Sequence, residues 1–155
     1  MHARVTGAAL VGAALLTACG GAVPSNLGVN VEAGGRLAPC PSSDNCVSSD
    51  ATTEMHRVEP FRLNGSPQEI WPQVRAVVEA MSRTKIVTSD DAYLHAECTS
   101  RVFRFVDDLE LHLRPDDGII AVRSASRIGR GDLGVNRKRV EALRQRLAAS
   151  GLLRE

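Results

Sequence analysis

Two adjacent carboxylates, Asp107 and Asp108, have the clearest potential for chemistry in this chain. They lie in a segment that alternates between apolar and polar residues, as a strand does, so their side chains point to opposite faces of a sheet. Asp107 shares its face with Leu109 and Leu111, where an apolar residue is expected. A carboxylate buried there must be paired or hydrogen-bonded. Asp107 is therefore either a structural anchor or a functional group, such as a general base or a polar contact to a ligand.

A β-hairpin brings basic residues next to this acidic strand. Asp117-Gly118 is a signal for a two-residue type I′ turn. A turn at that point places Asp108 opposite Arg127 and brings Arg123 to the same face. Complementary charges then cover this face, which we expect to be the wetter side of the sheet. Loss of Asp108 should accordingly cost less stability than loss of Asp107.

Two serines, Ser124 and Ser126, share the face of Asp107. As nucleophiles they need a base, and the histidines of the chain show no triad-like arrangement with them. Small side chains also let a helix approach a sheet, which is the structural explanation for both serines. The glycine-rich loop at 129–134 is not a P-loop, because the Lys-Ser/Thr ending is absent. Its Asp132 is expected to accept hydrogen bonds from the loop or from the helix start.

The last helix is predicted to begin directly after this loop. Its free backbone N–H groups are the expected partners of Asp107, helped by the helix dipole. The basic run Arg137-Lys138-Arg139 is expected to be solvated; alternatively, it meets anionic lipid head groups.

Charges balance over the whole chain but are segregated along it. The 155 residues include 19 Lys and Arg and 18 Asp and Glu, so the chain lacks the net positive charge of a nucleic-acid-binding protein. Eight acids and three bases lie from Asp90 to Asp117, whereas nine bases and two acids lie from Arg123 to Arg154. We expect the acidic and basic elements to pack together as ion pairs. An anion-binding surface on the basic part is the alternative.

The elements that must position these residues follow from periodicity and turn signals. Ser66-Pro67-Gln68-Glu69 has an N-cap serine, a proline at the first helical position and a capping-box acid. Strands are predicted where apolar residues alternate between turn signals. The expected order is a strand at 60–64, a helix to Met81, strands at 85–88, 93–99, 103–113 and 119–128, and a helix at 135–150. This order predicts an α+β fold, with a mostly antiparallel sheet of about five strands and two helices packed on one face.

The N-terminus has the features of a secretory signal peptide at residues 1–18: a basic start, an uncharged apolar run and small residues. The run is about 12 residues long, and about 20 are needed to span a bilayer. It ends in Leu16-Thr17-Ala18-Cys19, which resembles a bacterial lipobox, the signature in which the cysteine is lipidated. Residues 19–37 are predicted to be a flexible tether, followed by a single globular domain at 38–151.

Lipidation of Cys19 would place the protein in the cell envelope, attached to a membrane. Because Gly20 carries no charge, we expect the periplasmic side of the outer membrane if the organism has one. Otherwise the outer face of the plasma membrane is expected.

Three further cysteines follow Cys19. Export implies an oxidising compartment, where disulfides persist. Cys40 and Cys46 bracket a tight loop and are predicted to form a disulfide; five intervening residues exceed the usual spacing of zinc ligands, and no second pair follows. Cys98 alternates with apolar residues and is predicted to be a buried free thiol. No metal or cofactor is expected.

Four segments resemble the domain of unknown function 1499 family of bacteria and plastids. They are Cys40–Ser49, Phe105–Glu110, Val122–Gly129 and Asp132–Val140, and the likeness covers about residues 37–147. Arg130 stands where an aromatic residue is common in the family. The family has no established activity, so the resemblance implies a domain boundary without a reaction. It does imply that one polar constellation contains Asp107, Asp108, Arg123, Ser124, Ser126, Arg127, Asp132, Asn136 and Arg139.

The function expected from these features is that of a membrane-anchored envelope lipoprotein whose domain is a non-catalytic binding or structural module. Its expected partners are the membrane, through Cys19, and an unknown protein or small anionic ligand; nucleic acid is not expected. The alternative is a hydrolase-like enzyme that uses the Asp/Arg/Ser cluster. An enzyme should have a cavity that reaches Asp107 or Asp108 beside an arginine or serine, whereas a structural network should be closed.

Overall fold

A computed structural model describes residues 26–30 and 34–154 of the chain. Its centre is a six-stranded, mainly antiparallel sheet in the order β3-β8-β7-β6-β5, and β4 also pairs with β8. The strands are β3 (Cys46–Ser48), β4 (Phe61–Arg62), β5 (Thr84–Ser89), β6 (Tyr93–Thr99), β7 (Val106–Arg114) and β8 (Ile119–Ser126). A separate two-stranded sheet pairs β1 (Val29–Asn30) with β2 (Arg36–Leu37). The helices are α1 (Pro67–Glu79) and α2 (Val135–Ala149).

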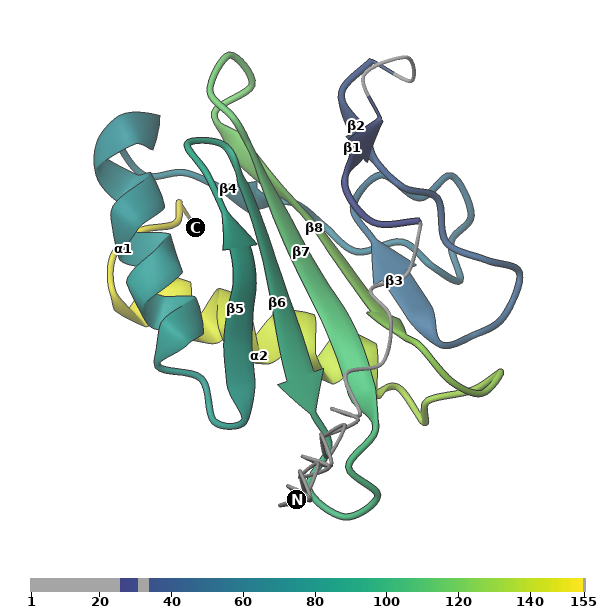
Figure 1. The fold of residues 1–155 in the computed structure, drawn as a ribbon. Coiled ribbons are helices and arrows are strands. Elements are labelled where there is room, and N and C mark those ends of the chain that lie inside the picture. Colours follow the sequence, from purple (N-terminus) through teal and green to yellow (C-terminus); the bar gives the residue numbers. More distant parts are fainter. Residues whose placement is uncertain (1–25, 31–33, 155) are drawn as a thin grey trace, which may run out of the picture.

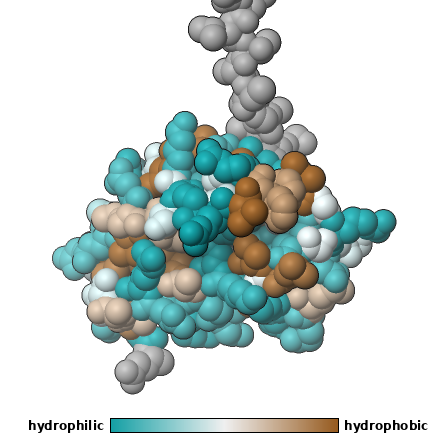
Figure 2. Space-filling model, turned by 90° about the horizontal axis from the view of Figure 1, so that it is seen from below, coloured by the Kyte–Doolittle hydropathy of each residue, from teal (hydrophilic) through white to brown (hydrophobic). Residues whose placement is uncertain are grey.

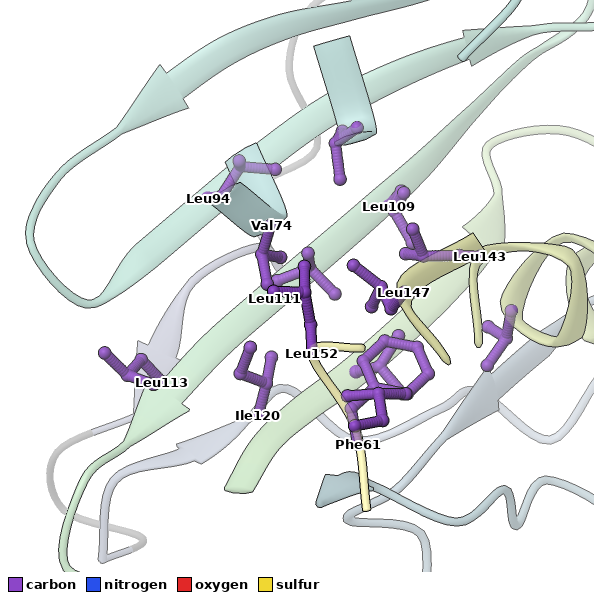
Figure 3. Close-up of a cluster of buried hydrophobic side chains, with 14 of the residues drawn as sticks. Phe61, Val74, Leu94, Leu109, Leu111, Leu113, Ile120, Leu143, Leu147 and Leu152 are labelled. Carbon is purple, nitrogen blue, oxygen red and sulfur yellow. The ribbon is translucent and has the colours of Figure 1, made fainter. Parts of the chain in front are cut away.

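Both helices cover the same face of the sheet, which confirms the predicted α+β class (Figure 1). Apolar side chains alternate along β6 and β7, so the face toward the helices is mainly apolar. Val74 of α1 and Leu143 of α2 pack against this face, where sheet residues such as Leu109 and Leu111 are fully buried. Figure 3 shows these side chains gathered between the two layers. A continuous apolar core of this kind is the main source of stability.

The predicted helices and long strands are present in the predicted order. Helix α1 begins after Ser66, with Pro67 in its first turn, although the Ser66 side chain makes no capping hydrogen bond. Helix α2 ends before Gly151, which has a φ of 72°, in the left-handed region that suits a glycine stop. Within the six-stranded sheet, the strand missed by the sequence pattern is β3, because three residues are too few to show a period.

The segment predicted as a tether contains two short strands in the parts that the structure describes. Strands β1 and β2 lie within it, and Leu37 is buried. The backbone N–H of Gly28 donates to Glu110 Oε1 at 2.7 Å, and that of Leu37 donates to Asp50 Oδ2 at 2.8 Å. In the described parts of this segment, residues 26–30 and 34–37, backbone groups are thus bound to side chains of the domain. Residues 1–25, with the predicted signal peptide and Cys19, lie outside the described residues.

The β7–β8 hairpin turns over four residues instead of two. The Gly118 N–H donates to the Pro115 carbonyl at 3.1 Å, and Arg114 pairs with Ile119. Proline has no N–H for a ladder, so pairing ends before it. The register moves by two positions, and Asp108 lies opposite Ala125 instead of Arg127. A shift of two leaves every side chain on its predicted face.

The cysteines have the predicted states. Cys40 and Cys46 form a disulfide, and Cys98 is a buried free thiol. The disulfide closes the loop that leads into β3, and β3 pairs with β8. This covalent link fixes the loop beside the charged face of the sheet.

Candidate functional site

The acidic and basic halves of the chain pair with each other, as their segregation predicts. Acids on β6 and β7 meet arginines on β8, directly after β8 and on α2. Strand β7 alone contributes three buried acids, Asp107, Asp108 and Glu110. Since a buried charge is costly unless it is paired, the partners of these three acids define the polar architecture of the domain.

Glu110 lies at the centre of the face opposite the helices and is completely buried. Its Oε2 accepts a hydrogen bond from Arg123 Nη1 at 2.7 Å, and its Oε1 accepts from the Tyr93 hydroxyl at 2.8 Å and the Gly28 N–H at 2.7 Å. Arg123 is only 1% exposed. Burial and the Glu110 carboxylate both raise the pKa of Tyr93, so the hydroxyl stays protonated and donates.

Asp108 lies on the same face of β7, two residues before Glu110. Its carboxylate accepts from Arg127 Nε and Nη2, and from His95 Nε2 at 2.7 Å. Burial alone would raise the pKa of Asp108, but the bonds from His95 and Arg127 outweigh it, so the pKa is lowered. Arg127 also reaches Glu97 Oε1 at 2.8 Å. The bonds to Asp108 raise the pKa of Arg127, so both partners keep their charges.

This face is not the wetter side that its charges predict, because Asp108 is 2% exposed. The first described residues and the loop before β3 cover it, because Asn26, Leu27, Pro41 and Ser43 line a cavity there together with Asp108. The Gly28 N–H binds Glu110. Asp50 forms a bidentate ion pair with Arg114, the last residue of β7. The sequence gives no periodic signal for this cover, so the strand looks amphipathic although both of its faces are buried.

The helix-facing side holds the second half of the polar constellation. Arg139 of α2 donates to Asp107 Oδ2, so Asp107 joins the strand to the last helix as expected, but through a guanidinium group rather than backbone N–H groups. The expectation that Arg139 is solvated is therefore wrong. Arg139 lies on the same helix face as Asn136, three residues earlier, and both point at the sheet.

Asn136 is the centre of this helix-facing network and is completely buried. Its Oδ1 accepts from Ser124 Oγ at 2.7 Å, and its Nδ2 donates to Ser126 Oγ at 2.9 Å and to the Asn45 carbonyl at 3.0 Å. Asp132 accepts from the backbone N–H groups of Gly134 and Asn136, both at 2.8 Å, as predicted. All nine predicted polar residues are thus brought near one region of the sheet, divided between its two faces.

A cavity of about 250 Å³ opens on the charged face. Its lining includes Asn26, Ser43, Asn45, Asp108, Arg123 and Arg127. Within the described part of the chain, the buried Nε of Arg123 has no hydrogen-bond partner. An unsatisfied buried donor is unusual, and a water, an ion or a ligand is its ordinary partner.

The sequence pattern did not identify four contributors to this site. Tyr93, His95 and Glu97 alternate on one side of β6, which places them beside the charges of β7. That alternation was a usable signal for a shared face. Asn45 has a different role, because its side chain lines the cavity while its carbonyl binds Asn136. It lies between the paired cysteines in sequence, where no period marks it.

In the described ranges 26–30 and 34–154, no helix is long and apolar enough to cross a membrane. No group of three or more His, Cys, Asp or Glu within the same ranges is arranged to hold a metal ion.

Comparison with known proteins identifies the domain. Residues 36–147, more than half of the chain, match the family described as Protein of unknown function (DUF1499). The chain belongs to the DUF1499 family. No curated protein matches it. The DUF1499 match begins at β2 and ends within α2, so it includes both polar networks and most of the lining of the cavity.

Proposed function

We propose that this DUF1499 protein is a lipid-anchored envelope protein whose domain binds a small anionic ligand in the cavity on the charged face. The observation that carries the proposal is that two arginines, Arg123 and Arg127, line one cavity, and that Arg123 Nε has no hydrogen-bond partner among the described residues. An N–H donor of a guanidinium group is best satisfied by a carboxylate, phosphate or sulfate oxygen.

The state of the candidate catalytic groups favours binding over hydrolysis. Asp108 is held by His95 and Arg127, and its pKa is lowered, which makes it a poor base. Ser124 donates to Asn136 and has no base beside it. Asp107 is held by Arg139 on the other face, outside the lining of the cavity. Among residues 26–30 and 34–154, the hydrolase alternative lacks an activated nucleophile.

Filling the cavity should abolish anion binding without removing a charge. Ala125 lines the cavity, so Ala125→Leu places an apolar side chain where the ligand would lie. Inorganic phosphate should raise the melting temperature of the wild-type chain and leave that of Ala125→Leu unchanged; a ligand at 100 times its Kd stabilises by about 2.7 kcal/mol. Differential scanning fluorimetry across a phosphate titration measures both.

The matched control is Ala76→Leu on the exposed side of α1. It should respond to phosphate like the wild type. A phosphate effect that survives in Ala125→Leu would place the anion elsewhere. If phosphate, sulfate and acetate all leave the wild-type chain unchanged, the cavity is not an anion site.

The lipid anchor rests on Leu16-Thr17-Ala18-Cys19 and is supported by the disulfide, which suits an oxidising compartment. Mass spectrometry of the N-terminal peptide from cells should find diacylglycerol on Cys19. Cys19→Ala should leave the precursor unprocessed and without lipid, and Cys98→Ala is the control that retains the lipid. A mature N-terminus at another residue, or an unmodified Cys19, would contradict the anchor.

A further inference from the structure

One end of the molecule exposes apolar side chains on two neighbouring loops. Residues 100–105 join β6 to β7, and residues 127–134 join β8 to α2. Asp107 pairs with Ser126, so both loops leave the sheet at the same end. Figure 2 views the molecule from this end and shows hydrophobic residues exposed there. The large exposed apolar residues of the two loops are Val102, Phe103, Phe105, Ile128 and Leu133.

The described fold gives no packing reason for these residues. Phe103 is 73% exposed, and its ring stacks on that of Phe105 with centroids 5.5 Å apart. Leu133 is 95% exposed. Its φ of 54° lies in the left-handed region that favours glycine, so neither burial nor backbone conformation accounts for a leucine there. Contiguous apolar exposure of this kind marks an interaction surface.

Basic residues are interleaved with these apolar tips. Arg101 and Arg104 flank Val102-Phe103 and are exposed, and the exposed Arg130 lies between Ile128 and Leu133 in sequence. The single acid of the two loops, Asp132, uses both carboxylate oxygens at the start of α2. Exposed Asp44 lies beside Arg130, which leaves an excess of positive charge. Aromatic and aliphatic tips flanked by arginines suit the interface of an anionic bilayer, where apolar groups enter and arginines reach phosphates.

The path of the chain brings the same end toward the membrane. Asn26 and Leu27 line the cavity together with Arg127 and Gly129, so the first described residues lie beside the loop at 127–134. The seven residue-to-residue steps from Cys19 to Asn26 reach at most about 25 Å. We propose that loops 100–105 and 127–134 dock on the anionic surface of the bilayer that holds the anchor. This inference rests on the lipid anchor proposed above and is independent of the cavity ligand.

The test measures which end of the anchored chain enters the bilayer. The full chain is reconstituted into vesicles of phosphatidylcholine, or of phosphatidylcholine and phosphatidylglycerol in equal amounts, with brominated acyl chains as quenchers. Tryptophan is introduced by Phe103→Trp, or by Asp116→Trp in the exposed turn at the opposite end of the hairpin. The wild-type chain gives the background from Trp71. Fluorescence of Phe103→Trp should fall by about half in the anionic vesicles, and that of Asp116→Trp by less than a tenth or so.

Charge removal completes the test. Adding Arg101→Gln and Arg104→Gln to Phe103→Trp should reduce the quenching to its level in phosphatidylcholine alone. Equal quenching at the two ends, stronger quenching of Asp116→Trp, quenching of neither, or no difference between the vesicles would overturn the docking. Absence of quenching at either end is also the result expected if the loops bind a protein instead of lipid. Flotation separates the two proposals: a chain that fails to float contradicts the anchor and the docking together, whereas a floating chain without selective quenching contradicts the docking alone.

Discussion

Replacement of Glu110 by alanine should lower the free energy of unfolding by about 3–5 kcal/mol, the cost of leaving one charge of a buried ion pair unpaired. Glu110 is fully buried and accepts hydrogen bonds from Arg123, Tyr93 and Gly28. Its loss leaves the Arg123 guanidinium, itself 1% exposed, without a counter-charge. Urea unfolding followed by circular dichroism measures the change.

Two further variants separate charge from packing. Glu79→Ala removes an exposed acid at the end of α1 and should change stability by less than about 0.5 kcal/mol. The double variant Glu110→Leu with Arg123→Met removes both charges and should recover part of the loss, because a buried ion pair can be replaced by apolar groups. The rest remains, because the Gly28 N–H and the Tyr93 hydroxyl still lack their acceptor. A Glu110→Ala variant as stable as Glu79→Ala would mean that water reaches Arg123 readily.

Asp108→Ala should be more damaging than Asp107→Ala, the reverse of the order predicted from strand alternation. Asp108 is bound by Arg127 and by the buried His95. Its removal should lower the free energy of unfolding by about 3–4 kcal/mol. This is near the lower end of the range for breaking a buried ion pair, because Arg127 still has Glu97 as a partner. Removal of Asp107 leaves Arg139 with Asn136 and Ser124 as partners, and should cost about 1–3 kcal/mol.

The control for both aspartate variants is Asp91→Ala, at an exposed position in the turn before β6. It should leave the urea midpoint nearly unchanged. If Asp107→Ala proves the more damaging, the cover over the charged face is weaker in solution than its contacts indicate. That result would also make the cavity accessible from more than one side.

Strand alternation and turn chemistry were enough to predict the central hairpins and both helices. They also placed Asp107, Ser124 and Ser126 on one face and Asp108, Arg123 and Arg127 on the other. The register was missed because Pro115 ends the ladder two residues early on its strand, and no periodicity reports that. The partner of Asp107 was missed because helix periodicity does not distinguish an exposed arginine from one whose charged end reaches a buried acid.

The burial of the charged face was the largest error, and its cause is physical. The segment that covers this face binds through the backbone N–H of Gly28, through a three-residue strand and through a disulfide. Backbone hydrogen bonds depend little on side-chain identity, so they leave no pattern in the sequence. Leu37 is buried in this segment, but it follows a Gly-rich stretch whose hydropathy does not predict burial.

The cover over the charged face also has a consequence for the order of folding. Strands β5 to β8 are joined by short connections and pair with their sequence neighbours, so their contacts require little loop-closure entropy. The bond between Gly28 and Glu110 instead joins residues 82 positions apart. Contact order therefore favours a route in which the hairpins form first, with Asp108, Glu110, Arg123 and Arg127 paired while still hydrated. Closing the cover then removes water from ion pairs that already exist, and no lone charge has to be buried on the way.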